Sequence, residues 1–309
     1  MSQWGLAVLT LLLLIGANGS GKTTLLRTLG TLLVPTRGEL RLFGEFERLG
    51  EFIAQLPMDV PAMFHKVLDR LEHDHGRELV EHSLSLIVTG RHGLLEGELL
   101  ELLARPGEAR FPMALWSRLY RNLVLYMKPR ASAAGGEEGL IDFFHRQLAK
   151  VIHDRYVAAD DARRARHGEL AAYFGRKGDP DGDDTWKGNY PRSLSELVPH
   201  QIAGEGWDDV EKSLTSIFFL EANVQFGRVF DLAVDFSAAV EVLPADRPNG
   251  RILRPLEKAL RRDVHFIALH ATDYPQSLFQ CLWNSCWWYD REEAADHYVA
   301  PEHGWNQNS

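Results

Sequence analysis

Cysteine is scarce in this sequence, since Cys281 and Cys286 are the only two among 309 residues. Two thiols cannot form the several disulfides that hold a small secreted scaffold together, so a reducing compartment, the cytoplasm, is the expected location. The two residues lie beside tryptophans, without a second cysteine pair or suitably spaced histidines. Packing in a core is therefore favoured over a zinc site.

Long apolar runs and an excess of positive charge are missing as well. The strongest run, residues 11–15, stops at Gly16, whereas a membrane-spanning helix needs about 20 apolar residues. Residues 1–10 contain no lysine or arginine, so a signal peptide with its basic beginning is not indicated. The 43 acidic residues outnumber the 34 basic ones and give a net charge of −9. We expect neither a membrane span nor a nucleic-acid partner.

What the sequence does contain is amphipathic periodicity, which dominates from residue 47 onward. Leu49, Phe52, Ile53 and Leu56 recur at helical spacing, and similar patterns follow along the chain. Helices are predicted, among others, over residues 140–156, 193–203, 207–217, 220–239, 252–270 and 276–288. The polar stretch 175–191 is rich in Gly, Asp and Pro, which predicts a loop and a domain boundary.

The first 46 residues have a different pattern. Residues 9–15 are typical of a buried strand of a parallel sheet, residues 23–33 have helical periodicity, and residues 39–43 are a possible second strand. This α/β segment is too short for a complete P-loop NTPase sheet, since each βα unit takes roughly 30 residues. The predicted fold is mainly α, with a short N-terminal α/β fragment.

A phosphate-binding motif lies between this strand and helix. Residues 16–23, GANGSGKT, match G-x-x-x-x-G-K-[ST] completely. Glycines let successive backbone N–H groups turn toward phosphates, and the following helix adds its positive N-terminal end. The Lys22 ammonium would lie between the β- and γ-phosphates, and the Thr23 hydroxyl would ligate Mg²⁺. ATP or ADP with Mg²⁺ is the predicted ligand.

The groups needed for hydrolysis are less evident. Residues 84–88 are apolar but continue into Thr89 and Gly90, not into the acidic pair of a Walker B strand. If hydrolysis occurs, Lys22 would stabilise phosphate charge and Thr23 would hold the metal, which makes these two the candidate catalytic residues. Whether the chain is an enzyme is left open by the sequence.

Residues 15–44, IGANGSGKTTLLRTLGTLLVPTRGELRLFG, resemble the beginning of an ABC-transporter ATPase. No LSGGQ-type signature helix accompanies them, which weighs against a complete transport ATPase. The resemblance implies that the nucleotide-binding positions are Gly16, Ala17, Asn18, Gly19, Ser20, Gly21, Lys22, Thr23 and Thr24.

Residues 47–305 resemble a second family, the NACHT-type STAND ATPases of the telomerase-associated kind, in the region that precedes their WD repeats. The resemblance rests on several stretches taken together, such as 52–57 (FIAQLP), 67–72 (VLDRLE), 93–99 (GLLEGEL), 140–148 (LIDFFHRQL) and 192–197 (RSLSEL). It implies a P-loop fragment over 1–46, a helical linker and winged-helix-like domain over 47–157, and a helical arm over 158–309 that meets a protein partner.

His145 acquires a specific role from this resemblance. A winged-helix histidine of STAND proteins can contact the β-phosphate of ADP, and His145 lies in a similar position, within a stretch predicted to be helical. Imidazole suits the task because it can donate to a phosphate and titrates near neutral pH. The alternative is a half-buried helix histidine bonded to neighbouring backbone.

Two clusters of possible metal ligands have simpler explanations. His73, His75, Glu78 and His82 lie within ten residues, but a helix end beside Gly76 is favoured over a zinc site. The aspartates of residues 179–184 do not have EF-hand spacing.

The functions left open are three. The first is an ATP-binding STAND-type signalling or scaffold NTPase, the second is a non-catalytic helical interaction scaffold with a vestigial P-loop, and the third is an ABC-transporter ATP-binding fragment.

Overall fold

The computed structural model describes residues 57, 59–124, 126–127 and 139–287, and this part of the chain is mainly helical. The predicted P-loop, residues 16–24, lies outside the described residues. In chain order the described helices are α4 (Val60–His75), α5 (Arg77–Thr89), α6 (Glu96–Leu102), α7 (Met113–Leu123), α8 (Arg146–Tyr156), α9 (Asp160–Gly178), α10 (Pro191–Ala203), α11 (Trp207–Thr215), α12 (Ile217–Gln225), α13 (Val229–Val242), α14 (Gly250–His270) and α15 (Ser277–Cys286).

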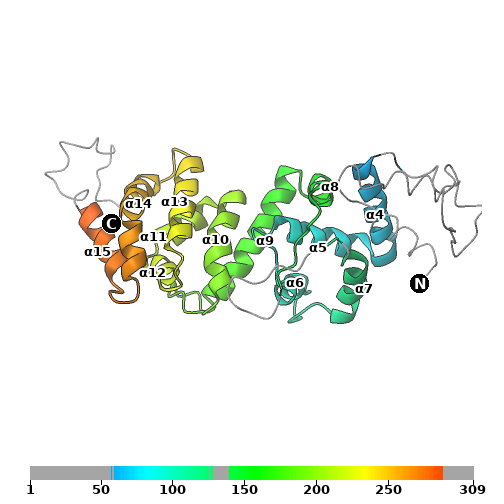
Figure 1. The fold of residues 1–309 in the computed structure, drawn as a ribbon, viewed down its shortest axis with the longest axis horizontal. Helices are drawn as coiled ribbons and strands as arrows, with labels where there is room; N and C mark the ends of the chain where they lie inside the picture. The colour runs from blue at the N-terminus through cyan, green and yellow to red at the C-terminus, as the bar shows by residue number, and fades with distance from the viewer. Residues whose placement is uncertain (1–56, 58, 125, 128–138, 288–309) are drawn as a thin grey trace, which may run out of the picture.

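The helices form an elongated array (Figure 1). Helices α4, α7 and α8 lie at one end, α9 and α10 in the middle, and α14 and α15 at the opposite end. The described residues include no β-strand, and isolated antiparallel bridges join Leu94 to Ile141 and Met127 to Phe143. No described helix has both the length and the apolar character that a membrane crossing requires.

Local sequence signals explain where the first helices begin and end. The Asp59 carboxylate accepts a hydrogen bond from Ala62 N at 2.7 Å and so caps α4. Gly76, with φ of 87°, ends α4 and separates it from α5. An L-residue with a side chain rarely adopts this backbone conformation, so the helical hairpin depends on glycine at this position.

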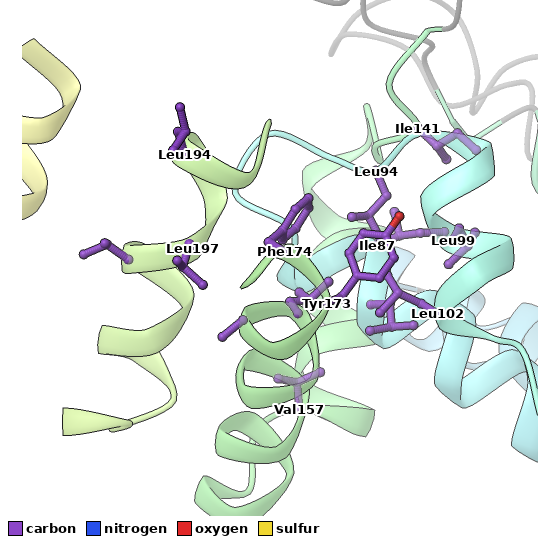
Figure 2. Packing of buried hydrophobic residues seen from close by; sticks show 14 of the residues in the cluster. Ile87, Leu94, Leu99, Leu102, Ile141, Val157, Tyr173, Phe174, Leu194 and Leu197 are labelled. Atoms are coloured by element: carbon purple, nitrogen blue, oxygen red, sulfur yellow. The ribbon is translucent and has the colours of Figure 1, made fainter. Parts of the chain in front are cut away.

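One cluster of buried apolar side chains extends from Phe64 to Leu282. Its middle is formed by α9, and Figure 2 shows Tyr173 and Phe174 between Leu194 and Leu197 on one side and Ile87, Leu99 and Leu102 on the other. The cluster includes residues on both sides of the loop that follows α9. That loop is itself packed, since the Trp186 ring meets Phe219 with centroids 4.7 Å apart. Its role as a domain boundary stays a prediction.

Two predicted helices differ from the observed ones. The helix expected over residues 140–156 begins only at Arg146, because Ile141 exchanges two backbone hydrogen bonds with Leu94, at 3.1 and 2.7 Å. The helix expected over residues 220–239 is two helices, α12 and α13, separated at Gly227, whose φ is 70°. In the first case, backbone pairing with a distant segment replaces the helix that the periodicity predicted. In the second case, a glycine turn interrupts it.

Candidate functional site

His145 is the one sequence-predicted site residue among the described residues. It lies immediately before the first residue of α8 and not inside the helix. Its backbone is extended, with φ of −93° and ψ of 101°, as expected of the residue that precedes a helix. Residues 140–145 are therefore outside the helix that the sequence suggested for them. The prediction of a helical environment for His145 was therefore wrong, while its role stays a prediction.

The His145 ring is enclosed by aromatic side chains. Its centroid lies 5.0 Å from that of Phe64 and 6.0 Å from that of Phe144, both in edge contacts. Nδ1 is buried and has no hydrogen-bond partner among the described residues. Burial lowers the pKa of His145, so the ring is neutral at neutral pH and one tautomer presents an unused N–H.

A second unused polar group belongs to Tyr126, whose ring also contacts Phe64. The Tyr126 ring meets Phe64 with centroids 6.1 Å apart, and its buried hydroxyl has no partner in the described part of the chain. Burial raises the pKa of Tyr126 to about 12, so the hydroxyl remains a donor at physiological pH. Sequence reasoning missed Tyr126, because a tyrosine in an apolar stretch gives no sign that its hydroxyl is unpaired.

The histidine-rich segment of residues 73–82 is divided between separate contacts. His75 Nε2 accepts from Asn122 Nδ2 at 2.8 Å, and His82 Nε2 lies 2.7 Å from Glu169 Oε1. No group of three or more metal-ligating side chains converges among the residues that the structure describes.

A buried ionic cluster between α6 and α10 also escaped sequence reasoning. Glu98 is 2% exposed and receives Arg192 Nε at 2.6 Å, Arg192 Nη2 at 3.0 Å and the Tyr190 hydroxyl at 2.6 Å. These bonds link residues more than 90 positions apart, so only the fold brings them together. Both oxygens of this carboxylate already accept hydrogen bonds from donors within the chain, which fits a structural role for the cluster.

The cluster continues along α10 through Glu196. Its Oε1 lies 2.7 Å from His92 Nδ1, and its Oε2 lies 3.3 Å from His200 Nε2, an ion-pair distance without hydrogen-bond geometry. Burial alone would raise the pKa of Glu196, but the His200 and His92 rings and the charge of Arg192 lower it to about 2. Glu196 is therefore an anion inside the protein, held by the cations and rings around it.

Comparison with known proteins finds similarity in the N-terminal segment and, separately, over longer parts of the chain. Residues 4–72 match the family model of ABC transporters. Human NACHT domain- and WD repeat-containing protein 1 is 36% identical over an alignment of 156 residues that covers 44% of this chain and 10% of that protein. Mouse telomerase protein component 1 is 24% identical over an alignment of 212 residues that covers 62% of this chain and 8% of that protein.

A cytochrome c biogenesis ATP-binding export protein, CcmA of Bordetella parapertussis, is 46% identical over 61 residues, which are 20% of this chain and 23% of that protein. The chain thus spans about a tenth of the NACHT and WD-repeat relative, and less of the telomerase component. No solved structure matches it. The resemblance predicted from the sequence is confirmed: this chain is similar to NACHT domain- and WD repeat-containing protein 1 and to telomerase protein component 1, and it has an ABC-transporter-like, P-loop NTPase-like segment within residues 4–72.

Proposed function

We propose that the chain binds ATP or ADP with Mg²⁺ through Gly16–Thr24 and acts as a STAND-type signalling or scaffold NTPase. The observation that carries the proposal is the complete GANGSGKT motif inside the segment that matches the ABC-transporter model. Lys22 would bridge the β- and γ-phosphates, and Thr23 would ligate Mg²⁺. Two relatives support this by name, one as an ATP-binding protein and one as a NACHT-domain protein.

The proposal assigns three parts to the chain. Residues 1–46 would be the P-loop fragment, residues 47–157 a helical linker and winged-helix-like domain, and residues 158–309 a helical arm. The antiparallel bridges beside α5, α6 and α8 support the winged-helix-like part. The cytoplasm would be its location.

Binding of Mg-ATP to the full chain, followed by calorimetry, tests the central claim. Lys22→Ala removes the phosphate-binding ammonium, so we expect affinity to fall at least tenfold. Lys258→Ala, an exposed lysine on α14, is the matched control and should bind as the unaltered chain does. Parallel measurement of phosphate release decides whether binding leads to hydrolysis.

Failure of the unaltered, folded chain to bind Mg-ATP would support the second function, a helical interaction scaffold with a vestigial P-loop. That alternative is favoured by the many large apolar side chains left exposed on α12–α15, such as Phe230, Phe266 and Trp283.

His145 would retain ADP in this proposal. Its neutral ring has an unused nitrogen, and the unpaired hydroxyl of Tyr126 belongs to a ring that contacts the same Phe64; both support contact with a polar ligand. His145→Ala is expected to weaken ADP binding several-fold more than ATP binding, and His65→Ala, an exposed histidine on α4, serves as the control. Unchanged ADP affinity in His145→Ala refutes the role.

A further inference from the structure

A groove of about 410 Å³ lies along α9, α10 and α11, far in the sequence from the P-loop. Its α9 wall carries Gly168, Ala172 and Gly175, spaced so that they share one face over two helical turns. A Cβ built on Gly168 meets nothing within 4 Å. The groove is open because these residues have almost no side chain to fill it.

Its far wall contains a nearly buried amide whose oxygen is unused. Gln201 is 7% exposed and donates from Nε2 to Ser213 Oγ at 3.0 Å. That bond orients the amide and leaves Oε1 without a partner among the described residues. An amide oxygen withdrawn from water costs free energy until a donor reaches it.

The end of the groove repeats this pattern with a carboxylate. Asp179 Oδ2 accepts from Asp184 N at 2.9 Å, whereas buried Oδ1 has no hydrogen-bond partner in the described part of the chain. The Trp186 ring lines the same end and offers a face of the kind that attracts cations.

The charges along the groove favour a positively charged occupant. Lys212 is engaged by Asp184 at 2.9 Å, so these two charges offset each other. Asp209, in the first turn of α11, has no ion pair within 4 Å among the described residues. Arg176 is the remaining lining cation, and the two carboxylates of Asp179 and Asp209 outnumber it. Among the lining groups without a partner, Asp179 Oδ1 and Gln201 Oε1 are acceptors, Trp186 Nε1 is a donor and His200 Nε2 can be either. Three lining carboxylates against two lining cations, Arg176 and Lys212, still disfavour an anion.

We propose that this groove binds an alkylguanidinium or alkylammonium compound, whose cationic head donates to Gln201 Oε1 and is attracted by the negative charge of the Asp179 and Asp209 carboxylates. The small residues of α9 accommodate the alkyl chain, and the acceptors receive the cationic head. The same chemistry is available from a free small molecule or from an arginine side chain of a partner. This site does not depend on the nucleotide-binding proposal.

Calorimetric titration of the full chain with agmatine tests the proposal. Gly168→Leu fills the groove while improving helix propensity, so we expect agmatine affinity to fall at least tenfold in a protein that remains folded. Gly97→Leu is the matched control, because a Cβ at Gly97 on α6 also meets nothing within 4 Å and lies outside the groove.

A second pair of variants tests the charge. Asp209→Asn should weaken binding about fivefold, as loss of one partly solvated ionic contact does. Asp246→Asn, which removes the same charge from an exposed position outside the groove, should have no effect. Binding lost in Lys22→Ala as well would contradict the independence of the two sites.

The source of the cation is decided by comparing agmatine with a short acetylated and amidated arginine peptide. Tighter binding of the peptide points to a protein partner, and tighter binding of agmatine points to a small molecule. The proposal is overturned if folded protein binds neither probe at millimolar concentration, if Gly168→Leu binds agmatine unchanged, or if hexanoate binds as well as agmatine does.

Discussion

The middle of the molecule and its C-terminal end differ in the side chains that they bury and expose. At the junction of α6 and α10, Glu98 and Glu196 are buried, at 2% and 0% exposure. At the other end, Leu269 of α14 and Trp283 of α15 are 75% and 57% exposed. One region places charge inside, and the other leaves large apolar side chains outside.

The difference shows two separate demands on one helical array. Directional bonds between Arg192 and Glu98 accept only one arrangement of α10 against α6, because the guanidinium fork must meet both carboxylate oxygens. We therefore hypothesise that the middle fixes a unique packing at a cost in desolvation. Exposed apolar residues contribute little to folding and are suited to contact with other molecules.

The largest expected effect comes from breaking the buried pair. Arg192→Met keeps an aliphatic chain but removes the guanidinium, which lies over the Phe174 ring, and leaves Glu98 as an uncompensated buried anion. We expect a loss of about 3–5 kcal/mol in the free energy of unfolding, measured by urea denaturation at neutral pH.

Arg77→Met is the control, since Arg77 and Glu81 are 74% and 34% exposed and lie 3.3 Å apart. A solvated pair of this kind contributes about 0–1 kcal/mol. Equal losses in the two variants would show that the cluster is no more important than a surface ion pair.

A smaller effect is expected from acid, through the histidine pair at the α9–α10 contact. His167 Nδ1 and His200 Nδ1 are 2.9 Å apart, and burial together with His200 lowers the pKa of His167 from 6.5 to about 4. The unfolded chain therefore takes up this proton first, and stability present above pH 6.5 is lost as the pH falls toward 4. Between pH 8 and pH 5 the loss is at most about 2 kcal/mol, because solvent around this half-buried ring screens the effect.

His167→Gln removes this titration and should flatten the dependence of unfolding free energy on pH over that range. His65→Gln, at an exposed position on α4, should leave the dependence as it is. An unchanged slope in His167→Gln means that other groups set the acid sensitivity of the middle region.

Much of the helical array could be predicted from the sequence alone. The predicted helices over 193–203 and 252–270 coincide with α10 and α14 to within two residues, because each presents one apolar stripe to the core. The predicted helix boundaries were wrong where contacts with distant residues, and not local periodicity, determine the backbone conformation. Residues 140–145 pair with Leu94, and no window of neighbouring residues contains that information.

The candidate sites divide in the same way. The P-loop is recognisable because all its residues are contiguous and the phosphate chemistry fixes their types. The Glu98–Arg192 pair and the groove beside Gln201 are assembled from segments far apart in the chain. A buried glutamate or glutamine looks like any surface residue in a sequence, so neither could be predicted.

The smallest expected effect tests the exposed end of the comparison. Trp283 is 57% exposed and stacks on Phe279 with ring centroids 5.9 Å apart, while its neighbour Leu282 is 7% exposed. Trp283→Gln removes apolar side-chain surface that is mostly exposed in the folded protein. The free energy of unfolding should therefore change by less than about 1 kcal/mol. Leu282→Ala, one position away on the same helix, should cost about 2–5 kcal/mol. If urea denaturation gave Trp283→Gln the larger loss of unfolding free energy, the aromatic face of α15 would be covered in solution. The C-terminal end would then bury its large apolar side chains against another molecule, and the contrast with the middle region would disappear.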